Sequence, residues 1–178
     1  MNLQVGYYGL SLFAGAVVAG AVAVIASRRA VTSVGRSLAL LMASVFLWSL
    51  AAAFEAAVPD TASKVLLSKI EYLGIASTPV LMFLFALKFS RSGSRSKRGR
   101  AAVLWLIPAL TLALTVTNEK HYLIWSGFSP AGGARDRLLL YDHGTFFWVS
   151  LAFVVITDVY IRLLSAGALS DPRVVFGG

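Results

Sequence analysis

The chain has 178 residues, of which 58% are hydrophobic and 13% are charged, and its mean hydropathy is +0.77. A soluble domain of this length needs a more polar surface, so the composition excludes that class and indicates a helical membrane protein. The formal net charge of +8 does not indicate nucleic-acid binding, because the basic residues occupy short segments between apolar runs. The absence of cysteine excludes disulfides and thiolate metal sites.

Five apolar stretches come close to or exceed the length that crosses a bilayer, and they lie at about residues 3–26, 37–58, 65–89, 101–117 and 144–164. Lipid offers no hydrogen bonds to the backbone, so each stretch is expected to be a helix. The first stretch has no basic region before it and is followed by SRRA, so we interpret it as a retained span and not as a signal peptide. We therefore predict one all-α membrane domain at residues 1–165 and a short tail at 166–178.

Basic residues predict the orientation of these spans. Arg28, Arg29 and Arg36 follow the first span, and Lys88 with the segment RSGSRSKRGR follows the third. The segment PDTASK and the long loop after the fourth span have mixed charge. The positive-inside rule then places the N-terminus outside and the C-terminus in the cytoplasm, in a multi-pass protein of the plasma or inner membrane. The basic segment after the third span also favours anionic lipid headgroups.

Aromatic and small residues add two expectations. Trp125 lies beyond the end of the fourth span and Trp148 near the start of the fifth, where amphipathic rings settle at the membrane surface. Glycine and alanine are frequent in the first span, so a neighbouring helix can approach it closely.

Ionisable residues inside spans are candidates for function. Glu55, Lys69 and Glu71 lie near the outer ends of the second and third spans, and the polar run Asn118–His121 emerges on the same side. One interpretation is an outward-facing polar pocket lined by spans two, three and four and covered by the long loop. The alternative is a network of ion pairs at the interface, in which Glu55 or Glu71 pairs with Lys64 or Lys69.

Other polar and proline residues have simpler interpretations. Asp158 and Arg162 are four residues apart on one helix face, which predicts a local ion pair near the inner interface. Pro79 and Pro108 interrupt backbone hydrogen bonding inside spans and are hinge candidates, with Ser77 and Thr78 placed to compensate near Pro79.

Signatures of catalysis are missing from the chain. It has no glycine-rich phosphate loop, no HExxH and no Cys/His ligand set. Its two histidines, His121 and His143, could approach each other with Asp142 and Glu119, but such irregular spacing is weak evidence for a metal. We therefore expect no enzyme activity, no metal and no cofactor.

Two segments have distinctive patterns: EYLGIASTPVLMFLFAL at residues 71–87, and IPALTLALTVTNEKHYLIW, which contains Thr-Asn-Glu-x-His. They resemble successive signatures of the seven-helix N-terminal sensor region of histidine kinases. Phe54-Glu55 and FFWV at Phe146–Val149 also fit, and the resemblance covers the chain to about residue 164.

The resemblance implies a membrane sensor that passes a signal to a cytoplasmic kinase or cyclase domain. The residues at matching positions are Glu55, Tyr72, Gly74, Pro79, Pro108, Asn118, Glu119, His121, Trp125, Phe147 and Trp148. We take as ligand-sensing candidates Glu55, Glu71, Tyr72, Asn118, Glu119, His121, Trp125 and Trp148. The expected partners are the bilayer, an output domain, a second copy of the chain and an unidentified small-molecule or physical stimulus, and nucleic acid is not among them.

The chain also departs from the family. It has five predicted spans where the family has seven, and it has no phosphoacceptor histidine motif, no ATP-binding boxes and no GGDEF sequence. We therefore expect a fragment or a separate form of the sensor region, without kinase activity of its own. Two alternatives stay open: a small transporter or permease fragment, and a structural membrane subunit.

Overall fold

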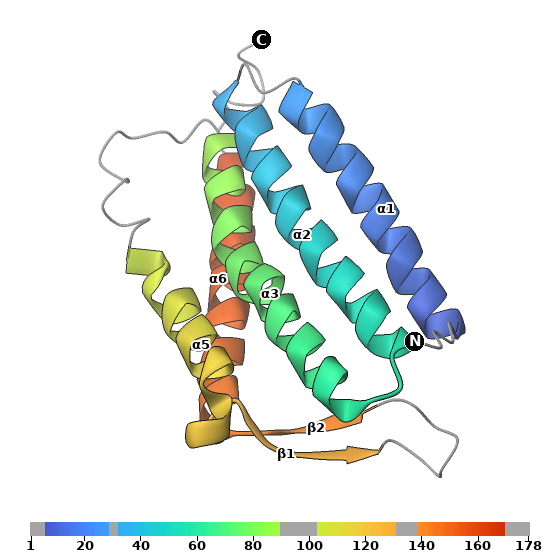
Figure 1. The fold of residues 1–178 in the computed structure, drawn as a ribbon. Coiled ribbons are helices and arrows are strands. Elements are labelled where there is room, and N and C mark those ends of the chain that lie inside the picture. The colour runs from blue at the N-terminus through green and yellow to red at the C-terminus, as the bar shows by residue number, and fades with distance from the viewer. Residues whose placement is uncertain (1–5, 29–31, 90–102, 131–138, 170–178) are drawn as a thin grey trace.

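The computed structural model describes residues 6–28, 32–89, 103–130 and 139–169, excluding the side chains of Pro130 and of residues 164–169. Five α-helices, a 3-10 turn and a β-hairpin make up this part of the chain (Figure 1). In chain order they are α1 (Tyr7–Arg28), α2 (Ser33–Ala57), α3 (Thr61–Phe89), α5 (Leu106–Val116), η2 (Asn118–Lys120), β1 (Trp125–Pro130), β2 (Leu139–His143) and α6 (Thr145–Leu169).

Four of these helices are long and apolar enough to cross a membrane: α1, α2, α3 and the Thr145–Leu163 part of α6. Large apolar side chains point outward along them, including Val18, Leu40, Leu66 and Ile156, each more than half exposed. A soluble protein would bury such residues, whereas a bilayer solvates them. The prediction of an all-α membrane protein is confirmed.

The fourth predicted span is helical over most of its described residues. Residues 103 and 104 are helical, and after Trp105 the chain forms α5, an apolar helix of 11 residues. At 1.5 Å per residue α5 is about 16 Å long, which is roughly half the thickness of the hydrocarbon core. Residues 101–102 lie outside the described part, as do the basic segment at 91–100, Arg29, Arg135 to Arg137 and the tail from residue 170 onward.

Small residues let α1, α2 and α3 pack side by side (Figure 1). Ala16, Ala19 and Ala26 are buried on α1, which confirms close packing of the first span. Gly74 on α3 faces the carbonyl oxygen of Ser44 on α2, and a Cβ atom there would lie 2.5 Å from that oxygen. Glycine at position 74 therefore sets how closely α2 and α3 approach.

Helices α5 and α6 form a second group that packs against α3 (Figure 1). The hydroxyl groups of Thr111 on α5 and Ser150 on α6 are 2.9 Å apart and hydrogen-bonded. One of the two hydroxyl groups donates in this contact and the other donates to a carbonyl of its own helix, that of Ile107 for Thr111 or that of Phe146 for Ser150. The predicted ion pair on α6 is confirmed, since Arg162 Nε lies 2.7 Å from Asp158 Oδ2.

The long loop after α5 contains an antiparallel hairpin that the sequence analysis did not predict. Strand β1 pairs with β2 from Trp125 opposite His143 to Pro130 opposite Leu139, with an irregularity between Trp125 and Gly127. The hairpin lies across the end of the bundle where α2 ends and α3 begins (Figure 1). We call this the hairpin end.

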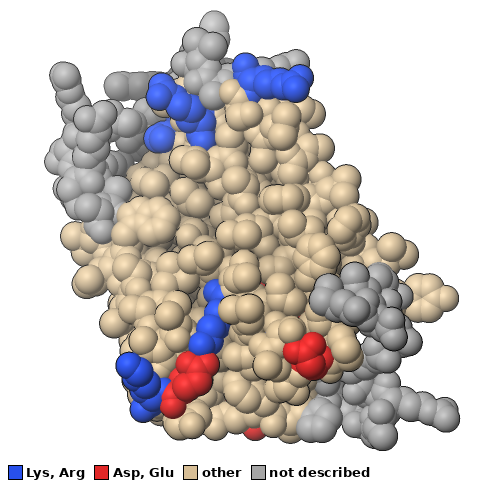
Figure 2. Space-filling model, in the orientation of Figure 1, with Lys and Arg blue, Asp and Glu red and all other residues tan. Residues whose placement is uncertain are grey.

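The opposite end of the bundle is the basic end, where α1 and α3 finish and α2 starts. Arg28, Arg36 and Lys88 belong to these termini, and Lys and Arg gather there on the face shown in Figure 2. Acidic and basic groups occur together near the hairpin end (Figure 2). This charge separation agrees with the positive-inside argument, and the orientation itself stays a prediction.

Candidate functional site

The Asn118 side chain forms hydrogen bonds with the backbone of the loop that follows α5. Its Oδ1 accepts hydrogen bonds from the backbone N–H groups of Ile124 and Trp125, both at 3.0 Å, and its Nδ2 donates to the Trp125 carbonyl at 2.9 Å. The residue is 2% exposed. Because all three bonds go to backbone atoms, the Asn118 side chain closes the loop, and it lines neither of the two cavities described below.

The turn after Asn118 is equally constrained. His121 Nδ1 accepts from the Leu123 N–H at 3.1 Å, which places its proton on Nε2, 3.1 Å from the Thr117 hydroxyl. Tyr122 has a positive φ of 55°. Gly144 packs directly on the carbonyls of Tyr122 and Leu123, where a Cβ atom would clash. We call residues 117–125 with Gly144 the Asn118 turn.

Trp125 is buried and does not anchor the protein at the membrane surface. It is 2% exposed and packs edge-on against Tyr72, with ring centroids 5.2 Å apart, in a core cluster with Ile124. Tyr141 lies on another side of the indole at 5.5 Å. The interfacial prediction is wrong for Trp125 because the hairpin folds back and covers the ring. Trp148, at 59% exposed, stays consistent with an interfacial position.

Glu119 takes part in an ion pair on the side of the turn that faces α3. Its carboxylate lies 2.5 Å from Lys69 Nζ, which also donates to the Val116 carbonyl at 3.2 Å. This bond lowers the pKa of Glu119, whose side chain is 60% exposed. An interfacial ion pair of Lys69 therefore exists, but its partner is Glu119 and not Glu55 or Glu71.

Tyr141 connects the hairpin to two transmembrane helices. Its hydroxyl donates to Glu55 Oε1 on α2 at 2.6 Å and, in turn, accepts from the Ser68 hydroxyl on α3 at 2.6 Å. Burial is the main cause that raises the pKa of Tyr141, and the hydrogen bond to Glu55 raises it further. The Tyr141 hydroxyl therefore stays protonated and keeps donating across the physiological pH range.

A cavity of about 290 Å³ lies beside this link. Its polar groups are Glu55, Lys64, Glu71 and Tyr141, and its apolar and aromatic lining comes from Tyr8, Leu12, Trp48, Ala52, Ala56 and Leu139. We call it the acidic cavity. Lys64 is 3% exposed and donates to the main-chain carbonyl of Glu55 at 2.7 Å, at the C-terminal end of α2.

The acidic cavity corrects the predicted polar pocket in two respects. Helices α1, α2 and α3 with strand β2 line it, whereas α5 does not contribute. Of the sensing candidates only Glu55 and Glu71 line it, and Asn118, Glu119 and His121 do not. The expectation that the polar run faces Glu55 and Glu71 is wrong, because the Asn118 turn directs that run onto its own backbone and onto Lys69.

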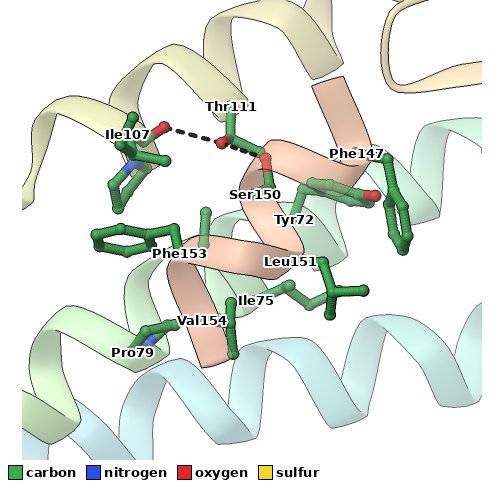
Figure 3. Close-up of a pocket in the computed structure, with 12 residues that line it drawn as sticks. Tyr72, Ile75, Pro79, Ile107, Thr111, Phe147, Ser150, Leu151, Phe153 and Val154 are labelled. Carbon is green, nitrogen blue, oxygen red and sulfur yellow. Dashed lines mark hydrogen bonds between the residues drawn. The ribbon is translucent and has the colours of Figure 1, made fainter. Parts of the chain in front are cut away.

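Pro79 and Pro108 line a second, apolar cavity of about 90 Å³ between α3, α5 and α6 (Figure 3). Tyr72 lies at one end of it, and the Thr111–Ser150 hydrogen bond runs along its wall (Figure 3). Helix α3 continues through Pro79, and Thr78 donates to the carbonyl of Gly74 at 2.7 Å. The two hinge candidates thus face one cavity, and a hinge role stays a prediction.

The two histidines have different surroundings. His143 stacks on Phe147 with ring centroids 3.6 Å apart and meets Trp148 edge-on, whereas His121 bonds within its own turn. In the described ranges, no group of three or more His, Cys, Asp or Glu side chains could hold a metal ion.

Sequence reasoning missed Tyr141, Ser68 and Trp48 as members of the site. Tyr141 belongs to LLLYDH, a short apolar and aromatic run that ends at Gly144 and is typical of a strand. That signal would have predicted a strand, but not its contact with Glu55. Such a contact joins residues 86 positions apart, and only the folded chain brings them together.

Comparison with known proteins identifies the fold family. A profile described as the N-terminal 7TM region of histidine kinase matches residues 11–170. Searches of curated proteins and of solved structures find no significant match. The profile covers most of the chain, including the helices and the hairpin described above. The chain therefore belongs to the family of the N-terminal 7TM region of histidine kinase, and it is a multi-pass membrane protein.

Proposed function

We propose that the chain is the membrane sensor module of a histidine-kinase-type receptor, that it lacks a catalytic core, and that its stimulus acts at the hairpin end. The observation that carries this proposal is the Tyr141 link. One phenol on the hairpin is bonded to Glu55 of α2 and to Ser68 of α3. A displacement of the hairpin therefore pulls on two transmembrane helices at once.

A signal needs two arrangements of the helices to which the stimulus binds with different affinity. The Tyr141 link supplies a polar contact that one arrangement keeps and the other breaks. Helix α3 extends from this contact to the basic end, where Lys88 bonds the Ser37 hydroxyl at 2.6 Å. A shift of α3 at Ser68 would thus reach the opposite side of the bilayer.

The apolar cavity gives α3 room to move relative to α5 and α6. Pro79 and Pro108 both line it, and Pro79, inside α3, removes a backbone hydrogen bond that would otherwise stiffen that helix. In this proposal α3 bends at Pro79, and α6 follows through its packing on α3. The receiving partner is a cytoplasmic kinase or cyclase domain.

The experiment uses a receptor in which the chain is joined, after α6, to a histidine kinase core in membrane vesicles. Tyr141→Phe removes the hydroxyl and keeps the ring, and we expect the rate of autophosphorylation to change at least about fivefold. Tyr122→Phe is the matched control, because this tyrosine is 57% exposed at the same end, and it should leave the rate unchanged.

Glu55→Gln gives an independent test of the same link, since it removes the charged acceptor. A receptor in which Tyr141→Phe and Glu55→Gln both leave the rate at the wild-type level would refute the proposal. The absence of a catalytic core is tested separately with purified chain and labelled ATP. Incorporation of label into the chain would contradict that part.

A further inference from the structure

The Glu71 carboxyl group stands out in the acidic cavity. In the part of the chain that the structure describes, no hydrogen bond or ion pair engages it, although Glu55 and Lys64 line the same cavity. Burial first, and the nearby Glu55 carboxylate second, disfavour a negative charge on Glu71. A half-buried, unengaged acid beside a second acid is a candidate for binding.

The chemistry of the lining favours a cation over an anion or a neutral ligand. Two carboxyl groups face the space, and the Lys64 ammonium points at the main-chain carbonyl of Glu55. The Tyr141 hydroxyl already uses its proton on Glu55. The Glu71 carboxyl group and the second carboxylate oxygen of Glu55 are thus left for a ligand, and as acceptors they favour a hydrogen-bond donor.

The remaining walls of the cavity are apolar and aromatic. Trp48 and Tyr8 offer rings, and Leu12, Ala52 and Leu139 offer aliphatic surface. Aromatic faces attract ammonium groups, and a hydrated metal ion would gain nothing from aliphatic walls. The cavity volume of about 290 Å³ fits a small organic molecule.

We propose that the acidic cavity binds an organic ammonium group, held by Glu71 and Glu55 and covered by Trp48, with its apolar part against Leu12 and Leu139. A cation beside Glu71 offsets the cost of burying its charged form next to Glu55. The ammonium is either that of a small soluble amine or that of an ethanolamine lipid headgroup. Only the effect of binding on signalling rests on the proposed sensor function, because binding itself is measured on the isolated chain.

The test is calorimetric titration of the purified chain, in an uncharged detergent without lipid, with 2-phenylethylamine. The neutral analogue 2-phenylethanol has nearly the same shape and no charge. We expect saturable binding of the amine and at least about tenfold weaker binding of the alcohol, because a charge-assisted hydrogen bond is lost.

Glu71→Gln is expected to weaken amine binding about tenfold or more. Glu119→Gln is the matched control, since it removes the same charge at the same end but outside the cavity, and the affinity should stay within about twofold. Circular dichroism verifies that both variants keep the helical content of the wild type. Equal binding of amine and alcohol, or unchanged amine affinity in Glu71→Gln, would overturn the proposal.

The source of the ammonium is decided by competition. Phosphatidylethanolamine added to the micelles displaces the amine if a headgroup occupies the cavity, whereas phosphatidylglycerol does not. If neither lipid displaces the amine, the natural ligand is soluble. If the chain does not bind the amine but Tyr141→Phe still changes the kinase output, the binding proposal is refuted. The sensor proposal then stands.

Discussion

Two polar clusters lie at the hairpin end, and they differ in how completely their hydrogen-bonding groups are used. In the Asn118 turn, the side-chain amide binds three backbone groups and His121 is bonded at both nitrogens. In the acidic cavity, the Glu71 carboxyl group has no hydrogen-bond or ion-pair partner among the described residues. The cavity, at about 290 Å³, is large enough for a small molecule. The first cluster has the properties of a structural element and the second those of a binding site.

The contrast separates a distinctive motif of the sequence from the proposed binding site. Thr-Asn-Glu-x-His carries part of the resemblance to the family, and its Asn and His maintain a turn. The acids of the cavity belong to less distinctive segments. Four variants would break or sharpen this contrast, and they follow in order of decreasing effect.

Asn118→Ala should have the largest effect. It leaves two buried N–H groups and one carbonyl without partners, and we expect a loss of about 4 kcal/mol in the free energy of unfolding. Unfolding is followed by circular dichroism in detergent. Asn118→Asp keeps the acceptor oxygen and should be less damaging. A loss below about 1 kcal/mol in Asn118→Ala would contradict the structural role.

Tyr141→Phe should destabilise the chain by about 2 kcal/mol, because it removes a bond to a carboxylate and leaves Ser68 without its partner. The measurement is the same unfolding experiment. The double variant Tyr141→Phe with Glu55→Gln tests the coupling. The double variant should lose less stability than the sum of the two single variants, because both changes remove the same hydrogen bond. Strictly additive losses would exclude that bond.

Glu71→Gln should act in the opposite direction and raise stability by about 1 kcal/mol, because it removes a carboxyl group whose charge is disfavoured by burial and, second, by Glu55. Gain of stability with loss of amine binding is the expected signature of a binding residue. The matched variant Glu119→Gln should lose stability or leave it unchanged. If Glu71→Gln destabilises the chain, then the carboxylate has a structural partner and the contrast between the two clusters fails.

The Lys69–Glu119 pair should have the smallest effect, about 0.5 kcal/mol, because the Glu119 side chain is 60% exposed. The pKa of Glu119 is lowered in the folded state from its usual 4.5, so the contribution is complete above about pH 5 and is lost as the pH falls through the lowered value. Lys69→Met should remove this part of the pH dependence of unfolding. A pH profile unchanged by Lys69→Met would exclude the pair as its cause.

Much of the fold could be predicted from the sequence because lipid solvation acts on local segments. Four of the five predicted spans correspond to helices that are long enough to cross, and the Asp158–Arg162 pair lies where its spacing placed it. The fourth predicted span corresponds to α5 with helical residues 103 and 104 before it, and residues 101–102 lie outside the described part. The hairpin was missed because its strands are short, and the apolar run that contains Tyr141 does not reveal its pairing with β1.

The candidate site could be predicted only in part. Glu55 and Glu71 were identified because charge inside a span is rare, and that argument needs no tertiary structure. Trp125 was assigned to the membrane surface because the sequence shows its distance from a span but not the strand that covers it. Tyr141 was missed because its role depends on a partner 86 residues away.

The sequence by itself determined that this chain is a multi-pass membrane protein, which family it belongs to and which acids lie in its spans. These properties follow from apolar length, motif spacing and the cost of a buried charge, all of which are local. Only the tertiary structure decided that Asn118 closes a turn, that Tyr141 ties the hairpin to α2 and α3, and that Glu71 faces a cavity. Each depends on which distant groups share a hydrogen bond, and chain order does not specify that.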